Sequence, residues 1–377
     1  MKNSSTLLFR LVVDKKDKGK LVGGWDNPTG DGLVFSCSVK ELNRRGRKLR
    51  KKAREWAAEF EDEDSTEPER WCELHQYAAE CFEYLFRDVW EEVSRALTEE
   101  KGDVAIKVLL FTPSVIFPWG LLCNPADVPT TGMSKNRPPA LWGSKYNLTV
   151  AQQYVNSSIA EHQSDWSFIP IVCQTTFAQQ TRVLANDERK LADLIQTRRV
   201  DPVATDVQLD SSSQCFFYIY SHGGNGQIEL VSNQGVRRSH SPLDIVSRWV
   251  KPGGRAVAVM NACDTVKSTR NMGETLMLAS YPREVASIST EFEIQDHFAM
   301  RFGLELVDRC VQLGESTVDA MKIMRKRHYP MSIVYSLYCL KAFALKQPLS
   351  LLDSENSHNY REAIKNVNFS DLTHGSE

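Results

Sequence analysis

Short runs of almost entirely apolar residues recur along the second half of the chain, at 168–173, 214–220, 256–260 and 285–289. Runs of this length and composition are typical of strands buried on both faces of a parallel sheet. Between the runs, apolar residues return at helical spacing over 184–196, 242–250, 272–280, 292–313 and 316–326. The alternation predicts a doubly wound α/β fold, with a mostly parallel sheet flanked by helices.

The first part of the chain has a different pattern. An apolar run at 7–13 predicts a strand, and helical spacing of apolar residues predicts two helices, at 42–60 and 74–97. Another apolar run, at 104–111, predicts a strand that leads into a Pro- and Gly-rich connector. After the first strand, a turn region is expected at Gly23, Gly24, Gly30 and Gly32.

Charge and composition narrow the function classes. The net charge of -2 offers no bulk attraction to nucleic acid or anionic membrane. The basic stretch at 44–54 alternates with an apolar helix face and is followed by an acidic segment, so we interpret it as a solvated face and expect no direct nucleic-acid binding. No apolar window approaches the roughly 18 residues of a membrane span, and the first residues do not resemble a signal peptide.

The nine cysteines are odd in number and form no CxxC pair. This pattern is typical of reduced thiols in a cytosolic protein rather than of a disulfide framework or a zinc site. The sequence therefore predicts a cytoplasmic protein without a metal or another cofactor.

Two reactive side chains follow two of the predicted strands. One residue separates His222 from the run QCFFYIY, and two residues separate Cys263 from the run AVAVM. The carboxyl ends of strands are where open α/β sheets build their sites. A crossover through the helix predicted at 242–250 commonly places its two strands side by side. We therefore expect His222 and Cys263 to lie close together, even with one strand between them.

A thiol beside an imidazole can act as a nucleophile. Only the thiolate attacks well, and an imidazole can take the thiol proton and later give it to a leaving amine. The glycines at 223 and 224 let a substrate backbone approach closely, and the amides of Gly223 and Cys263 are candidate oxyanion donors. The residues by themselves also allow another interpretation, in which Cys263 is a small buried hydrophobe and His222 a loop residue.

The segments FYIYSHGG (217–224) and AVAVMNACDT (256–265) resemble the His and Cys motifs of CHAT-domain proteases, a caspase-like group of clan CD. Three further segments resemble that family in the expected order, at 118–122 (PWGLL), 289–299 (STEF…D.FA) and 314–325 (GEST…A…R). Together they cover about residues 104–340. At 281–283, Tyr-Pro-Arg replaces the small residues of many members, and the helical repeats of many relatives are missing.

The resemblance implies a caspase-like fold and peptide-bond hydrolysis through an acyl-enzyme, with His222 and Cys263 catalytic and Gly223 in the oxyanion hole. It implies a non-catalytic, pseudo-protease-like half over 1–150 and a protease core over 151–345. The remaining residues, 346–377, are polar in composition and are expected to form a tail. It further implies one or a few protein substrates and a latent enzyme released by a regulatory partner or ligand, in antiviral defence or programmed cell death of bacteria.

Substrate preference is open. Caspase relatives that cleave after basic residues often carry Asp two positions before the cysteine, where this chain has Asn261, and this argues against a basic preference. Asp264 and Glu291 are candidate substrate-binding residues. The alternative to an enzyme is a catalytically silent interaction module with the same fold. A nucleotide-binding protein is disfavoured because His-Gly-Gly-Asn-Gly has neither GxGxxG spacing nor a Walker lysine.

Overall fold

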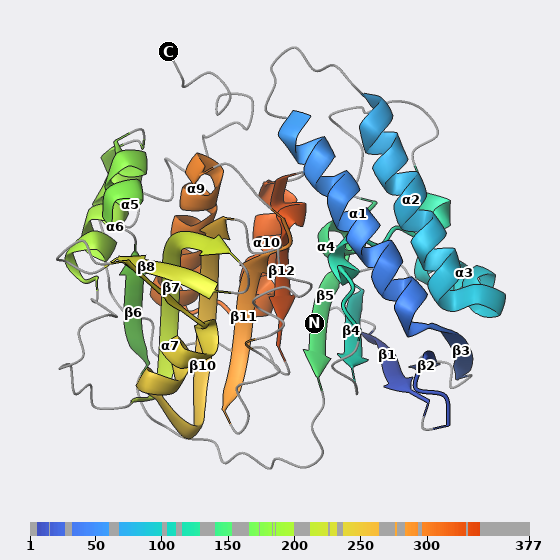
Figure 1. Cartoon of the computed structure of the whole chain (residues 1–377). Helices are drawn as coiled ribbons and strands as arrows, with labels where there is room; N and C mark the ends of the chain where they lie inside the picture. Colours follow the sequence, from blue (N-terminus) through green and yellow to red (C-terminus); the bar gives the residue numbers. More distant parts are fainter. Residues whose placement is uncertain are drawn as a thin grey trace. The chain divides into compact units, whose positions relative to one another are not determined.

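The computed structural model of the chain (Figure 1) consists of two compact units, Met1–Ser157 with Arg325–Leu340 and Ser158–Met324 with Lys341–Glu377. The domain boundaries expected from the sequence stay predictions, and the tail at 346–377 lies outside the described residues. The structure describes residues 6–14, 16–26, 32–59, 68–99, 104–110, 115–128, 140–152, 166–172, 174–182, 184, 186–199, 212–224, 227–231, 237–263, 276, 283–292, 296–328 and 331–339.

Unit 1 contains a mixed sheet in the order β3-β2-β1-β4-β5-β12. β1 pairs in parallel with β4, β4 with β5 and β5 with β12, whereas β2 and β3 extend the sheet in antiparallel fashion. Its strands are β1 (Thr6–Val13), β2 (Lys20–Asp26), β3 (Leu33–Ser38), β4 (Ala105–Leu110), β5 (Asn147–Gln152) and β12 (Tyr335–Tyr338). Its helices are α1 (Val39–Glu59), α2 (Pro68–Phe86), α3 (Trp90–Glu99) and α4 (Trp142–Lys145), with short 3₁₀ turns η1 (Arg87–Val89), η2 (Trp119–Leu121), η3 (Pro125–Asp127) and η5 (Met331–Val334).

Two predictions for unit 1 are wrong in detail. Gly23 and Gly24 lie within β2 and not in a turn. Position 23 has no room for a side chain, because the ring of Phe35 on β3 lies 2.2 Å from where a Cβ would stand. The helix expected at 74–97 is interrupted at Arg87, whose φ of 43° places it in the left-handed region. The break divides this segment into α2 and α3. α2 lies beside α1 (Figure 1), and the rings of Trp71 and Trp56 on the two helices pack with centroids 4.5 Å apart.

The strands of unit 2 pair in the order β11-β10-β7-β8-β9, with β6 also paired to β7. β6, β7, β10 and β11 are mutually parallel, and β8 and β9 form an antiparallel extension. Its strands are β6 (Ser167–Val172), β7 (Ser212–Gly224), β8 (Gln227–Val231), β9 (Arg237–His240), β10 (Val250–Cys263) and β11 (Glu284–Thr290). Its helices are α5 (Gln174–Thr181), α6 (Asn186–Thr197), α7 (Pro242–Trp249), α9 (Asp296–Val307), the π-helical turn η4 (Asp308–Gln312) and α10 (Thr317–Arg327), whose last residues belong to unit 1.

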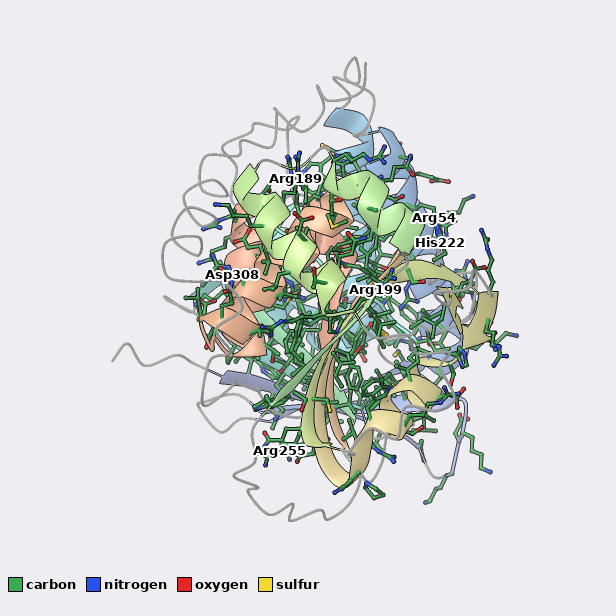
Figure 2. All side chains as sticks on the ribbon, turned by 90° about the vertical axis from the view of Figure 1, so that its left-hand side faces the viewer. Arg54, Arg189, Arg199, His222, Arg255 and Asp308 are labelled. Atoms are coloured by element: carbon green, nitrogen blue, oxygen red, sulfur yellow. The ribbon has the colours of Figure 1, made fainter. Side chains whose placement is uncertain are left out.

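The sheet of unit 2 is covered on both faces. Ile245, Val246 and Trp249 of α7 pack into an apolar cluster with Phe217 and Ile219 of β7. On the other face α9 packs on β7 and β10, so the two helices lie on opposite sides of the strands (Figure 2). α7 starts where the sequence predicts, because the Ser241 hydroxyl accepts from the Asp244 amide in a capping box.

Both units show the same order of elements. In each unit a first strand is followed by two antiparallel strands, then by helix, and then by a strand that pairs in parallel with the first. These strands are β1, β2, β3 and β4 in unit 1, and β7, β8, β9 and β10 in unit 2. The predicted α/β class, a mostly parallel sheet flanked by helices, is confirmed at this level of detail.

Candidate functional site

Three polar residues lie in one row at the carboxyl end of the parallel strands of unit 2. Cys263, the last residue of β10, is the register partner of His222 on β7. On its other side, His222 is the register partner of Glu229 on β8. Because neighbouring strands lie about 4.8 Å apart, the three positions are adjacent. We call Glu229, His222 and Cys263 the edge row.

The edge row forms where β7 changes partners. β6 pairs with β7 up to Tyr220, and β8 pairs with it from His222 to Gly224. The Ser221 hydroxyl, between the two, donates to the Glu229 carbonyl. Residues 225 and 226 are Asn-Gly, the dipeptide that most favours a two-residue hairpin connection, so the local sequence directs β8 back along β7.

A buried layer lies one step below the edge row. Tyr220 and Asn261 are register partners, each two residues before His222 and Cys263 respectively. The Tyr220 hydroxyl donates to the Asp296 carbonyl at 3.2 Å, and Nδ2 of Asn261 donates to the Ala299 carbonyl at 2.8 Å. Both acceptors belong to the first turn of α9, so this layer fixes the start of the helix beneath the strand ends.

Close packing continues further along α9. A Cβ at Gly303 would stand 2.1 Å from Nδ2 of Asn261 and 2.7 Å from the Tyr218 ring. Burial raises the pKa of Tyr218 above its usual range, so its hydroxyl stays protonated and lies 3.5 Å from the Asn261 amide. The helix can approach the two strands this closely because residue 303 has no side chain.

Two residues of the edge row, His222 and Glu229, are accessible to solvent. His222 is exposed, Gly223 is half-buried, and the Glu229 side chain is 34% exposed. Nη1 of Arg237 on β9 lies 3.2 Å from Oε1 of Glu229. Figure 2 labels His222 at one end of the strands and Arg255 toward the other, where Arg255 pairs with Glu284 at 3.2 Å. His222 thus lies at the carboxyl end of the parallel strands, where this class of fold builds its sites.

The other predicted site residues have different surroundings. Gly223 lies opposite Ile228 at the start of the hairpin. Glu291 follows β11 and is only 1% exposed, so its carboxylate is shielded in this structure, and Asp264 lies outside the described residues. Asn261 is buried and its amide bonds to α9, so that position serves packing rather than an open pocket. The specificity roles stay predictions.

Seven of the other thiols are described, and six of these are buried. Burial raises the pKa of Cys37 to about 11 and those of Cys81 and Cys339 to about 12. It raises the pKa values of Cys123 and Cys310 further still. A thiol with so high a pKa stays protonated near neutral pH and is a poor nucleophile.

Sequence reasoning did not identify Glu229. The Asn-Gly dipeptide at 225–226 could have indicated it, because this dipeptide favours a two-residue hairpin connection. Such a connection sets Gly224 opposite Gln227 and hence His222 opposite Glu229. Among the described residues, no cluster of three or more His, Cys, Asp or Glu side chains is placed to hold a metal ion. No helix within the described ranges is long and apolar enough to cross a membrane.

No protein-family profile matches the sequence, and no curated protein matches it. Among solved structures, a chain of the separase–securin complex of Saccharomyces cerevisiae aligns with 89% of this chain, at 9% sequence identity and a TM-score of 0.42. The aligned part makes up 30% of that chain. An identity and a TM-score this low assign no family, and the resemblance to CHAT-domain proteases stays a prediction.

Proposed function

We propose that this chain is a cysteine endopeptidase of the caspase-like type, with Cys263 as nucleophile and His222 as acid and base. The observation that carries the proposal is the register of β7 and β10, which are adjacent and pair Cys263 with His222 at their carboxyl ends. Among the cysteines that the structure describes, Cys263 is the one whose register partner on a neighbouring strand is a histidine.

The closeness of His222 to Cys263 allows the imidazole to activate the thiol. A free thiol has a pKa of about 8.5, so near neutral pH it needs help to ionise. An imidazole on the next strand, about 4.8 Å away along the sheet, is within reach of the thiol through the two side chains. As imidazolium it stabilises the thiolate, and as neutral imidazole it accepts the proton.

The proposed reaction has two stages. The thiolate attacks the peptide carbonyl carbon and forms a C–S bond, while amides at Gly223 and Cys263 stabilise the oxyanion. His222 then gives its proton to the leaving nitrogen, and the C–N bond breaks to leave a thioester. Water, losing a proton to His222, attacks the thioester carbon. The C–S bond breaks, releasing the acid product and restoring the thiol.

Unit 1 supports the assignment by contrast. The corresponding strands there are β1 and β4, and their pairing ends with Leu11 opposite Leu110, both buried and apolar. No acid–base or nucleophilic side chain occupies this end of the described pairing. We therefore propose that unit 1 is the non-catalytic, pseudo-protease-like half.

The finer features are proposals that follow from the sequence resemblance. We propose a protein substrate, an activity held latent until a regulatory protein or ligand releases it, and a role in bacterial antiviral defence or programmed cell death. The alternative is a catalytically silent module that uses the same fold for binding. It differs from the protease proposal in one measurable property, the reactivity of Cys263.

The test compares thiols within the same protein. The full chain, with any activating partner or ligand supplied, is treated with limiting iodoacetamide near pH 7, and the labelling of each cysteine is measured by mass spectrometry. We expect Cys263 to be labelled at least about tenfold faster than any other thiol, and His222→Ala to abolish the difference. Equal labelling of Cys263 and the half-buried Cys72 would refute the proposal.

A second measurement identifies the substrate. Cys263→Ala is used as a trap in a pull-down, and captured proteins are then incubated with the wild-type chain. We expect cleavage by wild type and by Cys72→Ser, and none by Cys263→Ala with its melting temperature unchanged. Persistent cleavage by Cys263→Ala would rule out a thiol mechanism at this residue.

A further inference from the structure

We propose that Glu229 is a positioning residue for His222, whose imidazole donates a hydrogen bond to the Glu229 carboxylate on the side away from Cys263. This inference rests on the proposed protease function, because an imidazole needs a fixed orientation only if it exchanges a proton with the thiol. Glu229 then completes a row of carboxylate, imidazole and thiol across three adjacent strands.

The strand pairing places Glu229 and His222 on the same face of the sheet. Directly opposite residues of an antiparallel pair have Cβ atoms about 4.5–5.5 Å apart and side chains on one face. Ile228 and Leu230, on either side of Glu229 in β8, belong to the apolar cluster beneath α7. Because side chains alternate along a strand, Glu229 faces the opposite way, toward the side covered by α9.

His222 shares that face. Tyr220, two residues earlier in β7, bonds to the start of α9, whereas Phe217 and Ile219 pack in the cluster beneath α7. Alternation therefore directs the His222 ring to the α9 side, together with the Glu229 carboxylate. A glutamate and a histidine placed in this way are within hydrogen-bonding reach through their side chains.

Arg237 pairs with one oxygen of the Glu229 carboxylate and leaves the second oxygen able to accept a hydrogen bond. Its Nη1 lies 3.2 Å from Oε1 of Glu229, and an ionised carboxylate has a second oxygen with lone pairs of its own. Arg237 lies on β9 two residues before Ser239, the register partner of Glu229. The ion pair thus steadies the Glu229 side chain along the sheet while one oxygen can accept from His222.

Other charged groups border this face. β9 contributes the exposed Arg237, and α9 begins with Asp296 and His297. Arg238, the register partner of Leu230, belongs to the opposite face. Burial, with the nearby Arg301, lowers the pKa of His297, which favours the neutral ring near neutral pH. Among these groups, Glu229 is the carboxylate set directly opposite His222 in the strand pairing.

The chemical consequence concerns the thiolate. A carboxylate close to an imidazole fixes which ring nitrogen carries the proton and stabilises the imidazolium. A more stable imidazolium favours the thiolate–imidazolium pair over the neutral thiol and imidazole. Loss of the Glu229 charge should therefore reduce thiolate formation near neutral pH, and should have little effect where the thiol ionises unaided.

The experiment measures the pH dependence of Cys263 alkylation by iodoacetamide in the full chain, between about pH 5.5 and 9.5. At about pH 6.5 we expect Glu229→Gln to slow alkylation about twofold to fivefold, the range for an exposed charge pair. Above about pH 9 the rates of wild type and variant should converge, since a free thiol has a pKa of about 8.5. Glu229→Asp, which keeps the charge, should recover part of the loss.

Three comparisons separate positioning from a purely structural role. In a His222→Ala background, Glu229→Gln should have no further effect, because its influence passes through the imidazole. Arg237→Gln breaks the same ion pair and should change alkylation less than Glu229→Gln does. Asp193→Asn, the same loss of charge at an exposed site on α6, should leave the profile unchanged.

The outcomes are distinguishable. If wild-type Cys263 reacts no faster than the other thiols, the proposed protease function fails, and this inference fails with it. If Cys263 is reactive but the Glu229→Gln profile matches wild type, only the role of Glu229 is refuted. The same holds if Arg237→Gln reproduces the Glu229→Gln profile, since the ion pair alone would then account for the effect.

Discussion

Tyr220 and Asn261 lie side by side on β7 and β10, and each donates a side-chain hydrogen bond to a main-chain carbonyl in the first turn of α9. They are the buried residues directly below His222 and Cys263. The positions of the proposed nucleophile and base are thus tied to one helix start through two hydrogen bonds, in a layer that excludes water. Several measurable properties of unit 2 depend on this arrangement.

Asn261→Asp should destabilise the protein by about 2–4 kcal/mol. The change replaces an amide donor by a buried carboxylate that faces the Ala299 carbonyl, so a hydrogen bond becomes a repulsion. Urea unfolding measures the effect. Gln179→Glu, the same change at an exposed position of α5, should stay within about 0.5 kcal/mol of wild type. A loss of similar size in both variants would contradict the role given to the Asn261 amide.

Gly303→Ala should also destabilise, although alanine favours helices by about 1 kcal/mol over glycine. The added Cβ would stand 2.1 Å from Nδ2 of Asn261, and such overpacking costs about 1–3 kcal/mol beyond what the helix gains. Gly24→Ala is the control, because nothing lies within 4 Å of the Cβ there. Thermal unfolding of the two variants should differ clearly. A stabilised Gly303→Ala protein would show that α9 does not approach the strands this closely.

Arg309 is the centre of a buried charge cluster. Its guanidinium bonds to Glu305 at 3.0 Å and to both oxygens of Glu315 at 3.1 Å. Burial opposes the charged guanidinium, but the two carboxylates outweigh burial and raise the pKa of Arg309. Arg309→Ala leaves the Glu305 side chain, 3% exposed, without this partner and should cost about 3–5 kcal/mol in urea unfolding.

A surface pair is the control for this cluster. Arg44 lies 2.7 Å from Glu41, and its side chain is 59% exposed. Arg44→Ala should change the unfolding free energy far less than Arg309→Ala does, because water and salt screen an exposed pair. If the two arginine variants lose equal stability, burial does not govern the strength of the Arg309 cluster.

His75 should make unit 1 less stable in mild acid. Its Nδ1 lies 2.8 Å from the Trp71 carbonyl, and burial lowers the pKa of His75 from 6.5 to about 4. The unfolded chain therefore binds a proton first as the pH falls. The stability contribution is complete above pH 6.5 and is lost as the pH falls from there toward about 4, reaching a loss of about 2 kcal/mol near pH 5.

His75→Phe tests this linkage. The substitution removes the titrating group, so the difference in unfolding free energy between about pH 7 and pH 5 should shrink by about 2 kcal/mol. A change in stability at pH 7 alone reflects packing against Trp71 and does not bear on the pH effect. An unchanged pH dependence would show that His75 does not titrate differently in the folded protein.

The apolar runs of the sequence located the parallel strands of unit 2, because a strand buried on both faces must be apolar throughout. β10 nevertheless extends to both sides of the predicted 256–260, since residues near its ends contribute backbone hydrogen bonds without an apolar signal. The strands β2 and β3 of unit 1 were missed, because β2 carries the two glycines that were interpreted as a turn.

The features of the candidate site likewise fall into those that the sequence predicts and those that only the tertiary structure determines. The sequence by itself determined that His222 and Cys263 lie at the carboxyl ends of buried strands, because a local apolar run ending in a polar segment marks the end of a strand. Both residues belong to the strands rather than following them. Only the tertiary structure decided that β7 and β10 are neighbours in the register that pairs these residues, that Glu229 lies on the other side of His222, and that Asn261 bonds to α9. The physical reason is that periodicity is set by residues close in the chain. Register and helix approach are set instead by hydrogen bonds and side-chain volumes contributed by distant segments.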